Sequence, residues 1–246
     1  MKKLYHYTSI NNLALILKSG SIRFGRLDYV NDPTEGKSDD FHSLSSYIFI
    51  SCWTENEEEN LALWNMYTPD MNGVRIELEI PLFESYKVGE TENLLFSKSE
   101  FLNEQDGYFI VGGLNEPYRI EYTDDIKLLQ PSIRNTTGLH VESLAKCKRS
   151  IWKVEQECRY RLDIYPVDKT IQSEYFPDRY QHLIDNQTPP PIEGYMVKIK
   201  DESFRKMKIR FSPKLKNGDK EIVHALVNTY NGSATIQESS LKGLIR

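Results

Sequence analysis

The N-terminal part of the chain has the apolar spacing of a strand, a helix and a second strand. Residues 4–8 form a short aromatic run that predicts a strand. The apolar residues within 10–17 recur at offsets of 0, 3, 6 and 7, which places them on one helical face. Ser9 stands where its hydroxyl can cap this helix, and Gly20 stands where the helix would end. Residues 21–24 resume the strand pattern.

Four later segments also have the composition or spacing of strands. Residues 47–54 are β-branched and aromatic, without glycine or proline. Residues 74–80, 118–122 and 155–162 alternate, which is typical of half-buried strands. Strands therefore dominate the first 162 residues.

Two helices are predicted between these strands. Residues 61–67 carry apolar side chains before Pro69, and Thr54 or Asn56 can cap this helix. Residues 141–153 also have helical spacing and are rich in lysine and arginine.

The remaining segments add loops and a C-terminal unit. Residues 84–116 are weakly patterned and predict a helix-plus-loop insertion, whereas residues 124–137 and 166–193 predict loops. No linker or internal repeat divides the chain, so we expect residues 1–246 to form one α+β domain with a split, mostly antiparallel sheet and flanking helices. The C-terminal strands and helix that complete it are expected at 195–199, 206–211 and 219–230.

Composition narrows the functional class. The chain has 246 residues, 39% of them hydrophobic, and a net charge of −5, which does not favour tight non-specific nucleic-acid binding but allows a local basic cleft. Its 3 cysteines form no CxxC pair, which predicts a reducing compartment and no structural zinc. The sequence lacks an apolar signal region and any apolar run of about 20 residues, so we expect a cytoplasmic protein without a membrane partner.

Two glutamates form the first candidate for chemistry. Alternation in the predicted strand places Glu155, Glu157 and Arg159 on one face, with about 7 Å between successive Cα atoms on that face. One carboxylate can stabilise developing positive charge while the other activates an acceptor. The alternative is a solvated strand face with a Glu–Arg pair.

Other polar and aromatic residues have both a functional and a structural interpretation. His6 lies between two aromatic residues at the end of the first predicted strand and faces a helix N-terminus, where it can hold a ribose or phosphate or lie half-buried in the core. Ser51 and Thr54 can line a cleft, or Thr54 can cap a helix. Trp64 and Tyr67 can stack on a heteroaromatic ring or pack in the core.

The main alternative role for these carboxylates is to bind a metal. Asp32 and Glu35 could bind a divalent cation together with Glu155 and Glu157, as in metal-dependent nucleases, although the Asn31–Glu35 turn also has capping roles. The sequence has no HExxH, GxGxxG or P-loop motif.

As a set, the motifs resemble a bacterial family of domains of unknown function over residues 4–160. Their order also resembles the ADP-ribosyltransferase superfamily, which includes DarT-type DNA-modifying toxins. The set comprises Tyr5–Ser9, Asn31–Glu35, Ser51–Thr54, Leu63 to Gly73, and Trp152 to Arg159.

The resemblance implies an ADP-ribosyltransferase-like fold, with NAD as substrate and no metal. In it, Glu157 stabilises the oxocarbenium-like transition state and Glu155 orients or deprotonates the acceptor. The hydroxyl motif here is Ser-Cys-Trp-Thr rather than Ser-Thr-Ser. The residues that would bind NAD are His6, Tyr7, Thr8, Ser51, Thr54 and Tyr67.

The resemblance further implies a macromolecular acceptor, a toxin or anti-phage role and a possible cognate antitoxin. The basic segment before the Glu157 strand favours RNA or DNA as acceptor. A non-catalytic binding module is the third alternative. The NAD hypothesis requires that His6 and Glu157 line one cleft. The residues expected to contact nucleic acid are Lys146, Lys148, Arg149, Lys153 and Arg159.

Overall fold

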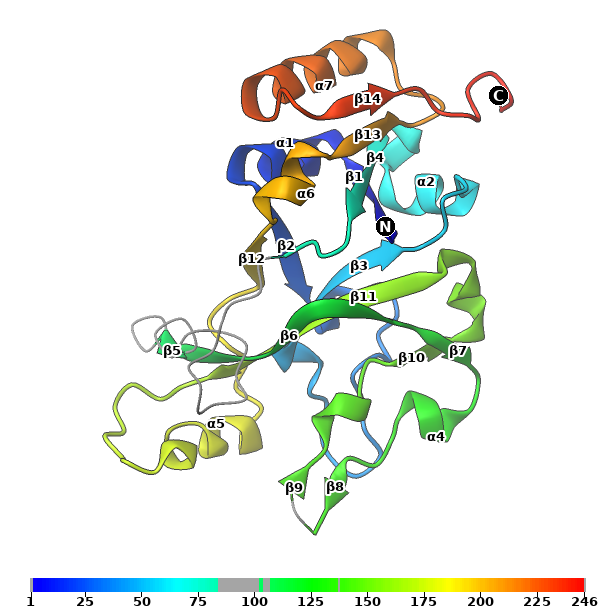
Figure 1. Ribbon diagram of the computed structural model, residues 1–246. Coiled ribbons are helices and arrows are strands. Elements are labelled where there is room, and N and C mark those ends of the chain that lie inside the picture. The colour runs from blue at the N-terminus through cyan, green and yellow to red at the C-terminus, as the bar shows by residue number, and fades with distance from the viewer. Residues whose placement is uncertain (1, 84–101, 104–106, 137, 246) are drawn as a thin grey trace.

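A computed structural model describes residues 2–83, 102–103, 107–136 and 138–245, and Figure 1 shows their arrangement. Within these residues the main sheet has 10 strands in the order β14-β13-β4-β1-β3-β11-β6-β5, with β2 and β12 branching from β3. Every strand pairing described in this sheet is antiparallel except that of β13 with β14. The predicted α+β class, with one domain and a mostly antiparallel sheet, is therefore confirmed.

The elements have the following bounds. The main-sheet strands are β1 (Lys3–Ser9), β2 (Ser21–Arg26), β3 (Ile48–Thr54), β4 (Gly73–Glu79), β5 (Leu102–Asn103), β6 (Tyr108–Arg119), β11 (Glu157–Pro166), β12 (Gly194–Lys198), β13 (Lys208–Phe211) and β14 (Thr235–Gln237). Two small sheets pair β7 (Glu121–Thr123) with β10 (Cys147–Arg149) and β8 (Arg134–Asn135) with β9 (Gly138–Leu139). The α-helices are α1 (Ile10–Ser19), α2 (Leu61–Tyr67), α4 (Ile126–Leu129), α5 (Gln181–Asp185), α6 (Asp201–Arg205) and α7 (Asn217–Tyr230).

The N-terminal strand-helix-strand unit follows local sequence rules. The Ser9 hydroxyl accepts a hydrogen bond from the backbone N–H of Asn12 at 3.2 Å and caps α1. Gly20 ends the helix with φ of 62°, a left-handed conformation that glycine adopts without penalty. α1 buries Leu13, Ile16 and Leu17 against the sheet, as the apolar spacing predicted.

The main sheet divides at β3. One edge of β3 pairs with β11 along its whole length. At the other edge, Ile50 pairs with Gly25 of β2, whereas Thr54 pairs with Tyr5 of β1. β1 and β2 therefore diverge from the same edge, and Figure 1 shows them separating beside β3. This divergence places the C-terminal half of β3 next to β1 and α2.

The two faces of β11 pack against different layers. Tyr160, Leu162 and Ile164 belong to the large core beneath α1 and α7. Side chains of the opposite parity, including Glu157 and Arg159, are also buried. The expected solvated face is therefore wrong, because a second layer of the chain covers it.

Several predicted elements differ in the structure. Residues 141–153 do not form a helix, because Cys147–Arg149 pair in parallel with Glu121–Thr123 of β7 and Ser150–Glu155 form a 3-10 turn. Gln156, with φ of 45°, separates Glu155 from β11, so the two glutamates do not share a strand face. Of the expected insertion, residues 84–101 lie outside the described residues, and residues 108–116 belong to β6.

Smaller corrections concern the last third of the chain. The predicted loop at 166–193 contains α5 and a 3-10 turn, Phe176–Arg179. The C-terminal segment also adds β14 as an edge strand. The described residues contain no helix that is both long and apolar enough to cross a membrane.

α2 begins later than the capping signal indicated. Asn60, rather than Thr54 or Asn56, is the N-cap, and its side-chain oxygen accepts from the N–H groups of Ala62 at 2.9 Å and Leu63 at 3.4 Å. The Asn60 amide also donates to the carbonyl of Val154 at 2.8 Å. Asn60 therefore joins α2 to the turn that carries Glu155.

Replacing Asn60 with alanine removes this cap. We expect the free energy of unfolding to fall by about 1 kcal/mol, within the range of about 0.5–2 kcal/mol for N-cap removal. Urea denaturation of the Asn60→Ala and wild-type proteins measures the change. Asn65→Ala, within the same helix and exposed, is the matched control. Equal losses in the two variants would contradict the assignment of Asn60 as the cap.

Candidate functional site

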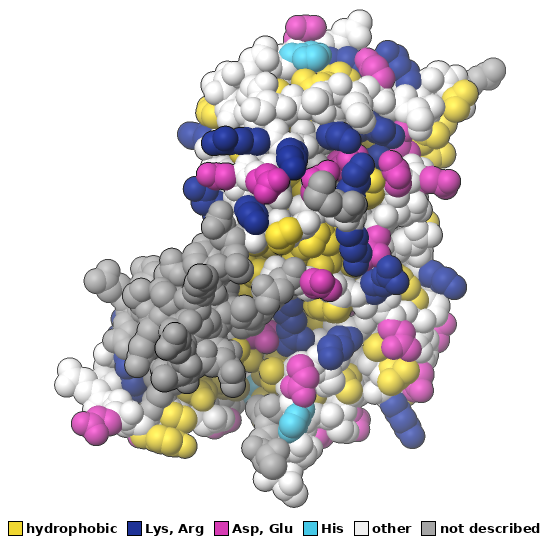
Figure 2. All heavy atoms as spheres, in the orientation of Figure 1, with side chains coloured by type: hydrophobic (Ala, Val, Ile, Leu, Met, Phe, Trp, Pro, Cys, Tyr) yellow, Lys and Arg dark blue, Asp and Glu magenta, His cyan; other side chains and the backbone are white. Residues whose placement is uncertain are grey.

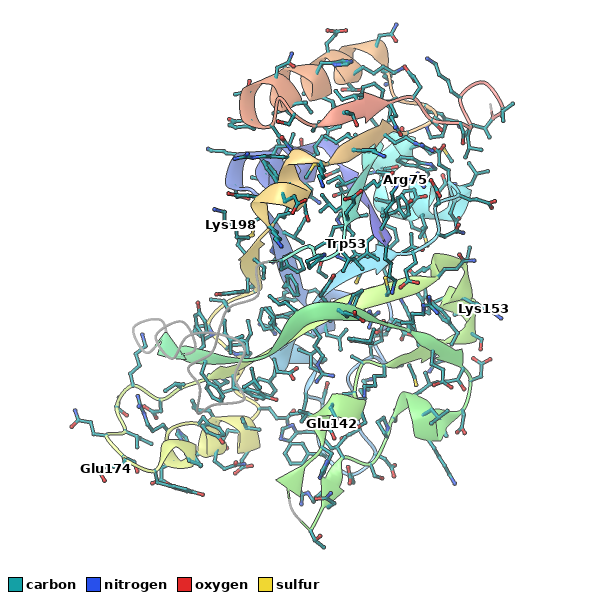
Figure 3. All side chains as sticks on the ribbon, viewed as in Figure 1. Trp53, Arg75, Glu142, Lys153, Glu174 and Lys198 are labelled. Atoms are coloured by element: carbon teal, nitrogen blue, oxygen red, sulfur yellow. The ribbon has the colours of Figure 1, made fainter. Side chains whose placement is uncertain are left out.

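A cavity opens between β1, the C-terminal half of β3 and α2, and it is called the β1–β3 cavity below. Its volume is about 350 Å3 with the open mouth included. Figure 3 labels Trp53, which is one of its walls, near the centre of the molecule. The lining residues are Tyr5, His6, Tyr7, Cys52, Trp53, Thr54, Leu63, Tyr67, Glu155 and Glu157.

His6 is fixed in one orientation. Its Nδ1 lies 2.9 Å from the carbonyl oxygen of Cys52, so Nδ1 carries the proton that this carbonyl accepts. The ring also packs beside Trp53, with 5.1 Å between centroids. Burial lowers the pKa of His6, with the Cys52 carbonyl opposing that shift. The imidazole is therefore neutral near pH 7, with Nε2 as an acceptor.

The tyrosine wall is supported from behind by a buried arginine. The Arg75 guanidinium lies 4.5 Å from the Tyr5 ring centroid and donates to the carbonyl of Glu57 at 2.8 Å. Tyr7 packs edge-on against Trp64 at 4.7 Å. Figure 3 labels Arg75 above Trp53. The aromatic side of the cavity is therefore rigidly packed.

Glu157 is held at the base of the cavity by two buried cations. Its Oε1 accepts from Arg159 Nε at 2.6 Å, and its Oε2 accepts from Arg159 Nη2 at 2.9 Å. Lys148 Nζ lies 3.4 Å from Oε2. Burial opposes ionisation of Glu157, but Arg159 and Lys148 outweigh it and hold the pKa below its ordinary value. Glu157 is therefore a fixed carboxylate.

Glu155 reaches the same cavity from the turn before β11. Its Oε2 accepts from Lys148 Nζ at 2.6 Å, and its Oε1 accepts from the Tyr67 hydroxyl at 2.6 Å. Tyr67 is 37% exposed, whereas Glu155 is 2% exposed. Burial and the charge of Glu155 raise the pKa of Tyr67, so its phenol stays protonated as the donor. Lys148 thus joins the two glutamates.

Glu35 completes a five-residue charge cluster. Its carboxylate accepts from Arg159 Nη1, and Lys148 Nζ lies 3.6 Å away. Three carboxylates therefore surround two cations, which leaves one formal negative charge in a buried site. The cluster consists of Glu35, Lys148, Glu155, Glu157 and Arg159.

This pairing bears on the alternative hypothesis of a metal site. Among the described residues, no group of three or more His, Cys, Asp or Glu side chains is placed to hold a metal. Asp32 Oδ1 accepts from the hydroxyl of Thr34 at 2.6 Å and from its N–H at 3.0 Å, whereas its buried Oδ2 has no hydrogen-bond partner among the described residues. A metal would have to displace Lys148 and Arg159 from the remaining carboxylates.

The cysteine in the cavity is held in the thiol form. Burial, and then the charge of Glu157, raise the pKa of the Cys52 thiol well above its ordinary value. The thiolate that nucleophilic chemistry requires is therefore scarce near neutral pH. Cys52 fills the wall between His6 and Glu157.

The lowered pKa of Glu157 predicts an acid-dependent loss of stability. Its contribution is complete above the unfolded pKa, near 4.5, and is lost as the pH falls through the lower folded value. We therefore expect the free energy of unfolding to drop more steeply below about pH 4.5 in wild type than in Glu157→Gln. Urea denaturation at several pH values measures both slopes. Parallel curves would contradict the shift.

The structure brings together most of the predicted cavity residues. His6, Tyr7, Thr54, Tyr67, Glu155 and Glu157 line it, but Thr8 and Ser51 do not. Ser51 lies on the same face of β3 as Trp53, and its hydroxyl accepts from the indole of Trp53 at 2.8 Å. Thr8 is buried and pairs with Val74 of β4.

The expected basic surface is wrong in part. Lys148 and Arg159 are buried beneath the cavity, at 3% and 1% exposure, and cannot contact phosphates. Lys146, Arg149 and Lys153 are exposed. On the face shown in Figure 2, lysine and arginine side chains are interspersed with acidic ones rather than forming a continuous stripe.

Sequence reasoning missed the walls that complete the cavity. Tyr5, Cys52, Trp53 and Leu63 were not singled out as site residues, although all four lie inside the quoted motifs. The strand alternation within those motifs was the available signal. Lys148 was identified, but as a surface residue.

Comparison of the chain with profiles of known protein families, with curated proteins and with solved structures finds no match.

Proposed function

We propose that the protein is an NAD-dependent ADP-ribosyltransferase with an ADP-ribosyltransferase-like fold. The observation that carries the proposal is the placement of His6 and Glu157 in one cavity above a charge cluster with one excess negative charge. Loss of nicotinamide from NAD builds positive charge at the anomeric carbon. A fixed, buried carboxylate stabilises such charge without reorganising.

Each side chain has a role in this proposal. His6 Nε2 accepts a hydrogen bond from a ribose hydroxyl, because Nδ1 is committed to the Cys52 carbonyl. Glu157 stabilises the oxocarbenium-like transition state. The ring of Tyr67 stacks on nicotinamide at the cavity mouth. Because the cavity is small, it receives the nicotinamide–ribose half of NAD.

Glu155 has the acceptor role. It lies behind Tyr67 and is linked to Glu157 through Lys148. An acceptor hydroxyl or amine that replaces the Tyr67 hydroxyl at Glu155 Oε1 would be oriented toward the anomeric carbon. Lys148 and Arg159 act as positioning residues, since they hold both carboxylates in place.

The proposed acceptor is RNA or DNA. Its support is the trio of exposed cations at Lys146, Arg149 and Lys153, in the segment that leads to Glu155, together with the sequence resemblance to DarT-type toxins. A toxin or anti-phage role with a cognate antitoxin follows from the same resemblance. A metal-dependent nuclease is disfavoured, because Lys148 and Arg159 pair with three of its four proposed ligands, Glu35, Glu155 and Glu157.

Label transfer tests the proposal. The protein is incubated with NAD labelled in its adenylate moiety and with RNA, DNA or a protein extract, each with and without EDTA. We expect label on nucleic acid in both conditions. Magnesium-dependent cleavage of nucleic acid without transfer of label would contradict it and favour the nuclease.

A further inference from the structure

A second, larger cavity lies at the other end of β11 and is called the β6–α5 cavity below. Its volume is about 1140 Å3 with the mouth included. It shares no lining residue with the β1–β3 cavity. In Figure 1, α5 and the β8–β9 hairpin lie on the same side of β6, and both elements contribute to the lining.

Four half-buried aromatic rings give this cavity its chemistry. Phe109 and Tyr165 are stacked, with centroids 5.3 Å apart and planes at 30°. Tyr180 is tilted against Phe109 at 5.0 Å, and Phe41 lies on the facing segment. All four rings keep part of their surface exposed. Tyr165 also stacks on the buried ring of Tyr47, with 5.6 Å between centroids, so the rings form one packed aromatic wall. Such a wall offers apolar surface to a planar ligand.

The rim of the cavity carries groups of opposite charge. Arg134 is exposed, and its guanidinium lies 5.0 Å from the centroid of Phe41. Asp185 and Gln181 lie on α5, where the Gln181 amide donates to Asp185 Oδ1 at 3.1 Å. Asp185 can accept from an amino group, whereas Arg134 can bind a phosphate. An apolar wall with a hydrogen-bond acceptor on one side and a cation on the other matches a nucleobase that carries an amino group and is attached to a phosphate.

We propose that the β6–α5 cavity binds such a nucleobase against this aromatic wall, with its amino group at Asp185 and its phosphate at Arg134. Tyr165 and Glu157 share one face of β11 and are eight residues apart, which corresponds to about 26 Å along the strand. The site is thus separate from the proposed NAD site, and it does not depend on ADP-ribose transfer.

Quenching of 2-aminopurine tests this site. A single-stranded pentanucleotide with a central 2-aminopurine is titrated with the protein in the absence of NAD, and AMP and UMP are used as competitors. We expect the fluorescence to fall on binding and AMP to compete better than UMP, since UMP lacks an amino group. Tyr180→Ala should raise Kd by about 5- to 150-fold, the range for loss of one stacking partner.

Control variants separate the site from general surface effects. Tyr230→Ala removes an exposed tyrosine outside the cavity and should leave Kd unchanged. Arg134→Ala should weaken binding of the pentanucleotide, and Asp185→Asn should reduce the preference for AMP over UMP. Tighter binding of the strand than of AMP assigns an unpaired base in nucleic acid as the occupant, and equal binding assigns a free nucleotide. Absence of quenching, or equal Kd values for Tyr180→Ala and Tyr230→Ala, would overturn the proposal.

Discussion

The Glu157→Gln variant is expected to transfer ADP-ribose about 100- to 1000-fold more slowly than wild type, the usual cost of removing one preorganised electrostatic group. The amide keeps the shape of the side chain but loses the negative charge that, in the proposed reaction, stabilises the anomeric carbon. Single-turnover transfer from labelled NAD measures the rate. Glu155→Gln should lose transfer to the acceptor more than it loses nicotinamide release, because its proposed role concerns the acceptor.

Glu142→Gln is the matched control for this substitution. Glu142 is exposed and pairs with His140 at 3.0 Å, away from the lining of the β1–β3 cavity. Its activity should equal that of wild type. The two variants and wild type must also show the same circular dichroism spectrum, so that a rate loss is not a folding loss. A Glu157→Gln rate within a few-fold of the Glu142→Gln rate would contradict the proposed role of Glu157 in the reaction.

Replacing Arg159 with methionine is expected to lower the free energy of unfolding by about 3–5 kcal/mol, the range for breaking a buried ion pair from one side. Arg159 is 1% exposed and donates to both Glu157 and Glu35. Without it, Lys148 alone would neutralise three buried carboxylates. Urea denaturation measures the loss.

Two comparisons isolate the charge effect from the loss of packing. Arg119→Met removes an arginine that pairs with Glu55 at the surface, and exposed pairs contribute only about 0–1 kcal/mol. Adding Glu35→Gln to Arg159→Met should recover part of the lost stability, because it removes one uncompensated charge. If Glu35→Gln made Arg159→Met still less stable, the cluster would not be governed by charge balance.

Local signals in the sequence were sufficient for the elements that carry their own caps and periodicity. α1 could be predicted between Ser9 and Gly20, because the cap, the apolar stripe and the left-handed end all lie within 12 consecutive residues. The strands around it followed from β-branched and aromatic composition. The branching of β1 and β2 from β3 could not be predicted, since it depends on pairings between distant segments.

The charged face of β11 shows where pattern reasoning fails. Alternation correctly placed Glu157 and Arg159 on one face. However, alternation does not predict which segment packs against a strand face. Here the segment that carries Glu35 covers the face of Glu157 and Arg159. The burial of Lys148 has a similar cause, because β10 directs its side chain toward the glutamates rather than toward solvent.

The helix expected at 141–153 failed because β-pairing overrode helical spacing. Its apolar residues are not on one buried face, since Leu144 is 1% exposed and Ile151 is 81% exposed. Cys147–Arg149 instead pair with β7. The proximity of His6, Tyr67 and Glu157 could be proposed from the motif set, but the cavity itself required the strand register.

Release of nicotinamide is the measurement that tests the central claim most directly. Wild-type protein, incubated with NAD and nucleic acid in EDTA, should release one nicotinamide for each ADP-ribose that becomes attached, and both products should be lost together in Glu157→Gln. Nucleic acid that is cleaved or bound while NAD remains intact would contradict the assignment of the β1–β3 cavity as an NAD site.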